Sequence, residues 1–305
     1  MLYATTSPAE KRAALRERLR RREIAVFPGA FTPLSARLVE EKGFDGVYIS
    51  GAVLSAELGL PDVGLTTLSE VAQRGGQIAR MTELPAIVDA DTGFGEAMNV
   101  ARTVQELEDA GVAGLHIEDQ VNPKRCGHLD GKAVVDDTTA LQRIGAAVRA
   151  RRDPNLLVIA RTDIRAVSGL DAAVLRAQQL ADAGADVIFP EAMVSLDEFA
   201  AVKQAVGDDV AVLANMTEFG KSELFTHRQL EDAGVDIVIH PVSLLRIAMG
   251  AIERGLDTLK ADGTLQPAVA TMQTRARLYE LLDYEAYNAF DSGVFDFSLE
   301  HHFGA

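Results

Sequence analysis

The only cysteine of the chain, Cys126, lies in a short basic segment, where Lys124 and Arg125 precede it and His128 follows. Cationic neighbours lower the pKa of a thiol and make its proton available for transfer. A free cysteine is, however, more often a small buried apolar side chain than a reactive group. This segment alone therefore leaves two interpretations open, an acid–base thiol and an incidental cysteine in a surface loop.

Three carboxylates indicate a metal site. Asp89 and Asp91 come at the end of the apolar run that starts at residue 86, and a spacing of two puts both side chains on the same side of an extended chain. With Glu118, at the end of another apolar run, they would form an all-oxygen site suited to Mg²⁺ or Mn²⁺. By itself, the Asp-x-Asp pair is equally typical of a turn or a helix cap. Zinc is disfavoured, because Cys126 and His128 have no further ligands at a recognisable spacing.

Eight short apolar runs, which alternate with segments of helical spacing, predict the strands that would position these residues. They cover 24–27, 47–50, 86–89, 115–117, 156–159, 187–189, 210–213 and 237–239. Four of them begin shortly after a glycine suited to the left-handed position that ends a helix. Continuously apolar strands are typical of parallel sheets, and the count of eight favours an α/β fold with a closed (β/α)8 TIM barrel over an open doubly wound sheet. A charged segment from about residue 8 to 22 predicts a leading helix.

The chain has no linker rich in Ser, Gly or Pro, so we interpret residues 1–305 as a single barrel domain. The alternation of strands and helices stops at Gly263, and helices are predicted around 271–282 and 284–290. We therefore interpret 264–305 as a C-terminal helical extension, which either caps the barrel or docks on a neighbouring subunit.

The composition narrows the classes of function. The formal net charge is −15, which argues against nucleic acid and membrane partners, since nucleic acids and anionic membranes both require a basic face. No apolar run approaches the roughly twenty residues of a membrane span, and a single cysteine fits a reducing compartment. We therefore expect a cytoplasmic protein. An anionic ligand would need a local exception to the net charge, either a metal ion or a cluster of Arg and Lys.

In a (β/α)8 barrel, the chemistry belongs at the carboxyl ends of the strands. Polar residues follow seven of the predicted strands at that point: Tyr48, Ser50, Gly51, Asp89, Asp91, Glu118, Asp119, Arg161, Asp163, Glu191, Asn215, Thr217, His240 and Ser243. Two other histidines are assigned no role here. His116, within an apolar strand, is predicted to be a core histidine, and His227 is predicted to be an isolated surface residue.

The segment Lys124-Arg125-Cys126-Gly127-His128 resembles the Lys-Lys/Arg-Cys-Gly-His signature of the isocitrate lyase and phosphoenolpyruvate mutase superfamily, in its carbon–carbon lyase branch. Further segments that resemble this family lie at 27–29, 48–51, 60–62, 89–95, 116–120, 160–163, 189–192, 215–220 and 271–275, so the resemblance covers nearly the whole chain. The compact length, and Phe189 before Pro190, are most similar to the members that cleave 2-methylisocitrate in the propionate-degrading methylcitrate cycle.

The resemblance implies a Mg²⁺-assisted cleavage of the retro-aldol type, in which the tricarboxylate (2S,3R)-2-methylisocitrate yields pyruvate and succinate. The metal ligands that it implies are Asp89 and, directly or through water, Asp62, Asp91 and Glu118. Cys126 would be the acid that protonates the succinate carbanion. The base is less closely defined, and Tyr48 is our candidate.

The resemblance also implies a set of residues around the substrate: Ser50, Gly51, Ala52, Lys124, Gly127, His128, Arg161, Glu191, Asn215, Thr217, Arg246 and Arg275. The arginines would bind carboxylates through their planar forks, and Arg161 would act in catalysis as well. This set supplies the local cationic exception that the net charge demands.

Three positions depart from the family pattern: Ala52, which is often Gly, His240, which is often Tyr, and Leu129, which is Arg in some relatives. The first two departures bear on substrate specificity more than on reaction type. A superfamily enzyme acting on isocitrate, 2,3-dimethylmalate or oxaloacetate is therefore the alternative function, and a non-catalytic barrel that binds a dicarboxylate is the remote one. The resemblance further implies a homotetramer, built as a dimer of helix-swapped dimers that exchange the segment after Gly263.

Overall fold

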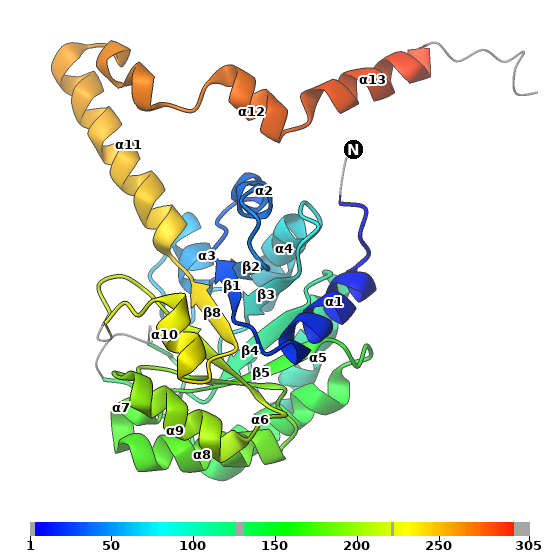
Figure 1. Ribbon diagram of the computed structural model, residues 1–305, viewed down its shortest axis with the longest axis vertical. Coiled ribbons are helices and arrows are strands. Elements are labelled where there is room, and N and C mark those ends of the chain that lie inside the picture. The colour runs from blue at the N-terminus through cyan, green and yellow to red at the C-terminus, as the bar shows by residue number, and fades with distance from the viewer. Residues whose placement is uncertain (1–3, 126–130, 221–222, 296–305) are drawn as a thin grey trace, which may run out of the picture. The chain divides into compact units, whose positions relative to one another are not determined.

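The computed structural model describes residues 4–125, 131–220 and 223–295, and a single sheet of eight parallel strands forms its centre (Figure 1). The strands are β1 (Ala25–Pro28), β2 (Val47–Ile49), β3 (Ala86–Asp89), β4 (Gly114–Glu118), β5 (Leu157–Thr162), β6 (Val187–Pro190), β7 (Ala211–Asn215) and β8 (Ile237–His240). Neighbours pair in sequence order from β2 to β8, and β8 pairs with β1. A bridge between Gly29 and Tyr48 joins the ends of β1 and β2, so the barrel is nearly closed. The predicted (β/α)8 TIM barrel is confirmed, and the open sheet is ruled out.

Helices connect the strands and cover the outside of the barrel (Figure 1). They are α2 (Pro33–Glu41), α3 (Gly51–Glu57), α4 (Leu68–Ala79), α5 (Ala97–Asp109), α6 (Asp137–Ala150), α7 (Arg165–Ser168), α8 (Leu170–Asp182), α9 (Leu196–Val206) and α10 (His227–Asp232). Several begin at a residue whose hydroxyl accepts a backbone N–H of the first turn, as Thr32 does for α2 and Thr226 for α10. The predicted leading helix is α1 (Pro8–Arg20), which has a capping box between Ser7 and Glu10.

Alternate residues of the strands fill the barrel interior. These side chains include Ala25, Phe27, Tyr48, Ile87, Leu157, Ile159, Val187, Phe189, Ala211, Leu213, Ile237 and Ile239. Leu15 of α1 belongs to the same cluster, and Arg16 of α1 donates to the backbone carbonyls of Pro154 and Asn155, just before β5. Helix α1 therefore covers the amino-terminal end of the barrel, which leaves the carboxyl ends of the strands for a functional site.

The chain divides into two compact units, Thr5–Ile247 and a second unit that contains residues 248–295. The second unit comprises most of α11 (Ser243–Asp262), the 3-10 helix η1 (Gln266–Thr271), α12 (Arg275–Leu281) and α13 (Tyr284–Phe295). Within this unit Leu281 is buried, whereas Ile252, Leu256 and Phe290 are at least half exposed. A run of helices that leaves large apolar side chains uncovered is typical of a segment that docks on another surface. The predicted exchange of this segment between subunits stays a prediction.

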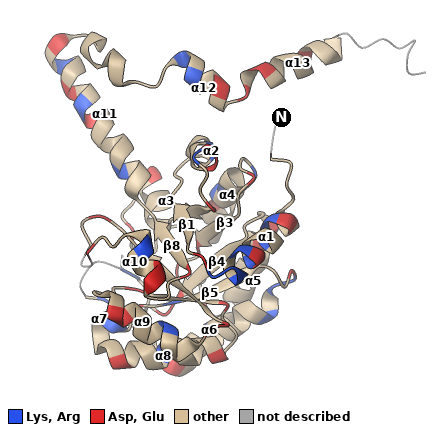
Figure 2. Ribbon diagram, viewed as in Figure 1, with Lys and Arg blue, Asp and Glu red and all other residues tan. Residues whose placement is uncertain are grey.

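Charged side chains of both signs are mixed along the helices. Figure 2 shows Lys and Arg interspersed with Asp and Glu on α1, α8 and α11. Among the described residues, no helix has the length and apolar content needed to cross a membrane.

Candidate active site

A cavity of about 270 Å³ opens at the carboxyl ends of the strands and collects most of the predicted site residues. The predicted residues that line it are Tyr48, Ser50, Ala52, Asp62, Asp89, Arg161, Glu191, Asn215, Thr217 and Arg246. Gly51 lies beside them, and its backbone N–H donates to Asp89 Oδ2 over 3.2 Å. Sequence reasoning gave no role to Phe219 or Val242, which also line the cavity, because neither side chain carries a group that signals chemistry.

Lys124 is buried among carboxylates at one side of this cavity. Its Nζ forms ion pairs with Asp62 and, over 2.7 Å, with Asp91 Oδ1. Burial by itself would lower the pKa of Lys124, but Asp89, Asp91, Glu118 and Asp62 together outweigh it and hold that pKa above the usual value. Lys124 is therefore a fixed positive charge at the centre of the predicted metal site.

Asp89 and Asp91 have opposite electrostatic environments although only two residues separate them. Burial raises the pKa of Asp91 to about 6, and the charge of Asp89 adds to the effect. For Asp89, His116 and Lys124 outweigh burial and lower the pKa to about 2. Two interacting carboxylates whose pKa values are pushed apart in this way are typical of a functional site.

Glu118 is a buried carboxylate with few partners. Neither of its oxygens has a hydrogen-bond partner among the described residues, and its Oε2 lies 3.3 Å from Arg161 Nη1. Burial raises the pKa of Glu118 well above its usual value, and the charge of Arg161 offsets this only in part. A desolvated carboxylate without donors is costly unless a cation or a proton joins it.

The carboxylate set fits a hard divalent cation by its chemistry. All four predicted ligands are carboxylates that can coordinate through oxygen, and both oxygens of Glu118 lack a hydrogen-bond partner among the described residues. In the part of the chain that the structure describes, however, no three His, Cys, Asp or Glu side chains are already grouped as metal ligands, and Lys124 supplies the positive charge there. We conclude that the residues fit the ion, although the ligand geometry is not preformed.

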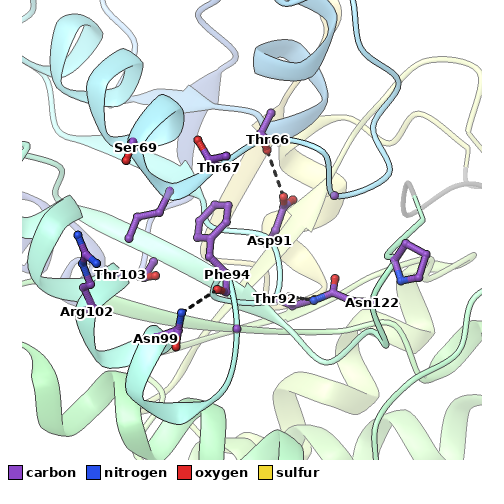
Figure 3. A pocket seen from close by; sticks show the side chains of 14 residues that line it. Thr66, Thr67, Ser69, Asp91, Thr92, Phe94, Asn99, Arg102, Thr103 and Asn122 are labelled. Atoms are coloured by element: carbon purple, nitrogen blue, oxygen red, sulfur yellow. Dashed lines mark hydrogen bonds between the residues drawn. The ribbon is translucent and has the colours of Figure 1, made fainter.

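A second, larger cavity of about 700 Å³ is lined by Asp91, among other residues (Figure 3). Asp91 has a positive φ of 47°, and its Oδ2 accepts a bond from Thr66 Oγ1 over 3.4 Å. Nearby, Asn122 donates to Thr92 Oγ1 over 2.8 Å, and Asn99 donates to the carbonyl of Phe94 over 3.2 Å, as Figure 3 shows. These contacts support the strained turn that presents Asp91 to Lys124. The charged groups converge in the smaller cavity, which is therefore the candidate active site.

Tyr48 and His116 form a buried pair at the floor of the candidate active site. Tyr48 Oη lies 2.7 Å from His116 Nε2, and His116 Nδ1 lies 3.7 Å from Asp89 Oδ1. Burial lowers the pKa of His116 to about 4, so its imidazole is neutral at pH 7. Burial likewise raises the pKa of Tyr48 well above its usual value. The tyrosine hydroxyl therefore donates to His116 Nε2, which leaves the His116 Nδ1 proton facing Asp89.

His116 is buried as predicted for a core histidine, but it also belongs to the site. The signal that could have found it is its position two residues before Glu118, which puts both side chains on the same side of β4.

Arg161 lies among three carboxylates. Its guanidinium donates to Asp163 over 3.0 Å and 3.2 Å and approaches Glu118 and Glu191 within 3.3 Å and 3.9 Å. It also stacks over the Phe189 ring, with 5.3 Å from Cζ to the ring centre. Although burial opposes its charge, these carboxylates raise the pKa of Arg161, so it stays cationic. Arg161 is thus held rigidly in the wall of the cavity.

Arg246 is a second arginine that lines the cavity. Its Nη1 donates to Thr217 Oγ1 over 2.9 Å and to the backbone carbonyl and Oε2 of Glu218 over 2.8 Å and 3.0 Å. Asn215 Nδ2 donates to Glu191 Oε2 over 3.3 Å, and both side chains line the cavity. The cavity therefore combines an acidic part around Asp89 with two arginines, Arg161 and Arg246, an arrangement that suits a polycarboxylate bound beside a metal ion.

Four predicted site residues are placed neither in the lining of this cavity nor in the contacts beside it that include Gly51, Asp91, Glu118 and Lys124. Cys126, Gly127 and His128 lie outside the described residues, and Arg275, at the start of α12, belongs to the second unit. Arg125, just before Cys126 in the sequence, has its backbone N–H and carbonyl both bonded to the side-chain amide of Gln120 over 2.8 Å. The roles of these four residues stay predictions.

Residues 15–260 match the family model described as phosphoenolpyruvate phosphomutase. Among curated relatives, the chain is 57% identical to the probable 2-methylisocitrate lyase 2 of Corynebacterium glutamicum, over 98% of this chain and 97% of the relative. It is 46% identical to the 2-methylisocitrate lyase of Aeropyrum pernix, over 96% and 94% of the two chains.

Solved structures agree with these relatives. The 2,3-dimethylmalate lyase, named as a PEP mutase/isocitrate lyase superfamily member, superposes with a TM-score of 0.87 at 34% identity, covering 95% of this chain and 96% of that one. Phosphonopyruvate hydrolase in complex with oxalate and Mg²⁺ superposes with a TM-score of 0.84 at 30% identity, covering 92% and 98%. The chain therefore belongs to the isocitrate lyase and phosphoenolpyruvate mutase superfamily, as its sequence motifs predict.

Proposed function

We propose that this chain is a 2-methylisocitrate lyase, which cleaves (2S,3R)-2-methylisocitrate to pyruvate and succinate. The observation that carries the proposal is the identity of 46–57% to relatives of that name over nearly the whole chain. The cavity supports the type of reaction, because it combines an acidic cluster suited to a metal ion with arginines suited to substrate carboxylates.

The acidic cluster would hold a divalent cation, Mg²⁺ or Mn²⁺. Asp89 is the first ligand that we propose, with Asp62, Asp91 and Glu118 acting directly or through water. The unpartnered oxygens of Glu118 and the raised pKa of Asp91 support this assignment, because a cation would relieve both. When bound, such an ion acts as a Lewis acid that lowers the pKa of the substrate hydroxyl.

The arginines would orient the substrate. Arg161 and Arg246 bind substrate carboxylates in the cavity, with Ser50, Gly51, Asn215 and Thr217 supplying further hydrogen bonds. Lys124, Ala52, Gly127, His128, Glu191 and Arg275 complete the proposed substrate shell. This arrangement is supported by the fixed positions of Arg161 and Arg246, each held by several described contacts before any substrate binds.

Proton transfer would involve Cys126 and Tyr48. Cys126 gives its proton to the carbanion that becomes succinate, an assignment that rests on its basic sequence motif. Tyr48, with its raised pKa, is a neutral hydroxyl and accepts the substrate proton only if its own proton leaves. The neutral His116 Nε2, 2.7 Å away, is the acceptor that we propose for that proton. Each proton then moves one step, from substrate to Tyr48 and from Tyr48 to His116.

A coupled assay with Mg²⁺ tests the proposal. It offers 2-methylisocitrate and isocitrate separately and follows the release of pyruvate or glyoxylate. Efficient release of pyruvate with weak release of glyoxylate is the expected result. A preference for isocitrate, 2,3-dimethylmalate or oxaloacetate would overturn the substrate assignment, and binding of dicarboxylates without turnover of any of these acids would favour the non-catalytic alternative.

A further inference from the structure

Two histidines meet beside the cavity, at the carboxyl end of β8. His240 Nε2 lies 3.0 Å from Nε2 of His227, the first residue of α10, and the two rings are tilted by 56° with centres 5.3 Å apart. His240 Nδ1 lies 3.2 Å from the backbone carbonyl of Met216. Both side chains are partly buried. The prediction that His227 is an isolated surface residue is therefore wrong, because the turn before α10 brings it against the next strand.

The contacts of this histidine pair define which ring nitrogens carry a proton. A carbonyl oxygen only accepts, so the contact with Met216 requires a proton on His240 Nδ1. In a neutral His240 the Nε2 atom is then bare, and it accepts the Nε2 proton of His227. Burial and the neighbouring His227 lower the pKa of His240, and neutrality at pH 7 follows. His227 thus stabilises the tautomer of His240 that binds Met216.

The backbone carbonyl that His240 contacts belongs to Met216, which directly precedes the cavity residue Thr217. The backbone N–H of Met216 donates to the carbonyl of Ile239 over 2.9 Å, and the backbone carbonyl of Met216 accepts a hydrogen bond from His240. The next residue, Thr217, accepts a hydrogen bond from Arg246, and both side chains line the cavity. His240 therefore fixes the backbone from which Thr217 meets Arg246.

We propose that His240 is a positioning residue for the carboxylate-binding end of the cavity, formed by Thr217 and Arg246, and that His227 fixes the tautomer on which this role depends. The identity of the ligand as a tricarboxylate rests on the proposed function, whereas the histidine tautomers do not. Because His240 touches neither the acidic cluster nor the cavity itself, its loss acts on substrate binding and not on the chemical step.

Three substitutions at two positions test the tautomer argument. In His240→Asn the amide nitrogen reaches the place of Nδ1 and keeps the bond to Met216, whereas His240→Leu removes it. We expect KM for 2-methylisocitrate to stay within about twofold in the first variant and to rise about fivefold to tenfold in the second, with kcat within about twofold in both. His227→Ala should raise KM by a smaller factor.

Two controls accompany these variants. His227→Gln, whose amide N–H takes the place of the Nε2 proton, should restore the KM of His227→Ala toward the original. Arg228→Ala, at an exposed position of α10, should leave KM unchanged, and circular dichroism and Tm check the folding of every variant. Equal KM values for His240→Leu and the unsubstituted enzyme, or a fall in kcat alone, would overturn the proposal.

Nitrogen-15 spectra of the imidazoles give a readout that needs no turnover. We expect a proton on Nδ1 of His240 and on Nε2 of His227, and a proton on Nε2 of His240 would overturn the proposal. If the enzyme turns over no 2-methylisocitrate, the proposed function fails. The effect of the same variants on the Kd of succinate with Mg²⁺, measured by calorimetry, then decides whether His240 positions the carboxylate-binding end.

Discussion

At the scale of single residues, the site depends on which side chains point into the barrel. Asp89 comes two residues after Ile87, Arg161 two after Ile159, and each apolar residue of these pairs belongs to the interior cluster. Since alternate residues of a strand face the same side, each polar residue continues an interior row beyond the point where the apolar core ends. The packing that closes the barrel therefore also orients the side chains of Asp89 and Arg161 toward the cavity.

The proposed acid can be tested by Cys126→Ser. A serine hydroxyl keeps nearly the volume of the thiol but holds its proton far more tightly, so it cannot protonate the carbanion at neutral pH. We expect turnover of 2-methylisocitrate to fall by about 10²- to 10⁴-fold, while Mg²⁺-dependent binding of succinate survives. Unchanged turnover would remove Cys126 from the mechanism, whereas loss of succinate binding would assign it to the substrate shell instead.

The raised pKa of Asp91 predicts that binding of the metal depends on pH. Because burial raises the pKa of Asp91 to about 6, the folded protein holds this proton more tightly than the unfolded chain does. Asp91 in its charged form therefore costs stability as pH rises toward and through about 6, and a bound cation offsets that cost. We expect the rise in Tm caused by Mg²⁺ to be small at pH 5 and largest above pH 7.

Glu118→Gln provides the matched variant for this measurement. An amide has the shape of the carboxylate without its charge, so the protein without metal should be as stable as the original or more stable. The rise in Tm with Mg²⁺ should shrink, with metal affinity weakened about tenfold or more. A rise in Tm that is the same at pH 5 and pH 8, or that survives this substitution, would argue against a metal at the carboxylate cluster.

At the scale of elements, Glu83 binds the chain that enters α1. Its carboxylate accepts hydrogen bonds from the backbone N–H groups of Thr5 and Thr6, both over 2.8 Å. Although slight burial opposes them, these bonds lower the pKa of Glu83 to about 2. A lowered pKa contributes stability that is present above the unfolded value and is lost as pH falls through the folded value.

Glu83→Gln should therefore destabilise the protein by about 1 kcal/mol at pH 7, a figure reduced for the partial exposure of the group. One of the two accepting oxygens is lost, together with the charge. We expect the difference in unfolding free energy between the two proteins to shrink as pH falls from about 4.5 toward about 2, measured by urea unfolding at several pH values. A difference that grows in acid would contradict the role of Glu83.

Most elements that carry the site could be predicted from the sequence, because continuous apolar runs and glycine helix ends are local signals. The eight strands follow the predicted ranges within a few residues, and Tyr48, Asp89, Arg161 and Arg246 meet in one cavity. The contacts of histidines could not be predicted in this way. The pairing of His227 with His240 depends on how α10 packs on β8, a tertiary contact that leaves no periodic signal.

At the scale of the whole molecule, the exposed apolar side chains of α11 to α13 predict an assembly. Ile247, Ile252 and Leu256 are 68%, 50% and 59% exposed, and Phe290 is 70% exposed. Monomeric proteins rarely leave such residues uncovered together. We propose that these helices pack on neighbouring copies in a homotetramer, in which residues 264–305 exchange between subunits.

Leu256→Asp tests this assembly, because it places a charge where the proposed interface is apolar. The full-length protein should have the mass of a tetramer by light scattering, and the variant should dissociate to smaller species with unchanged circular dichroism of the barrel. Arg254→Gln, exposed on the same helix, changes the net charge by the same amount and should stay tetrameric. If the variant retains the full mass, or if the unsubstituted chain is a monomer, these side chains do not join subunits. Because most of the barrel core lies within Thr5–Ile247, dissociation should leave that unit folded, so mass and fold can be separated in one sample.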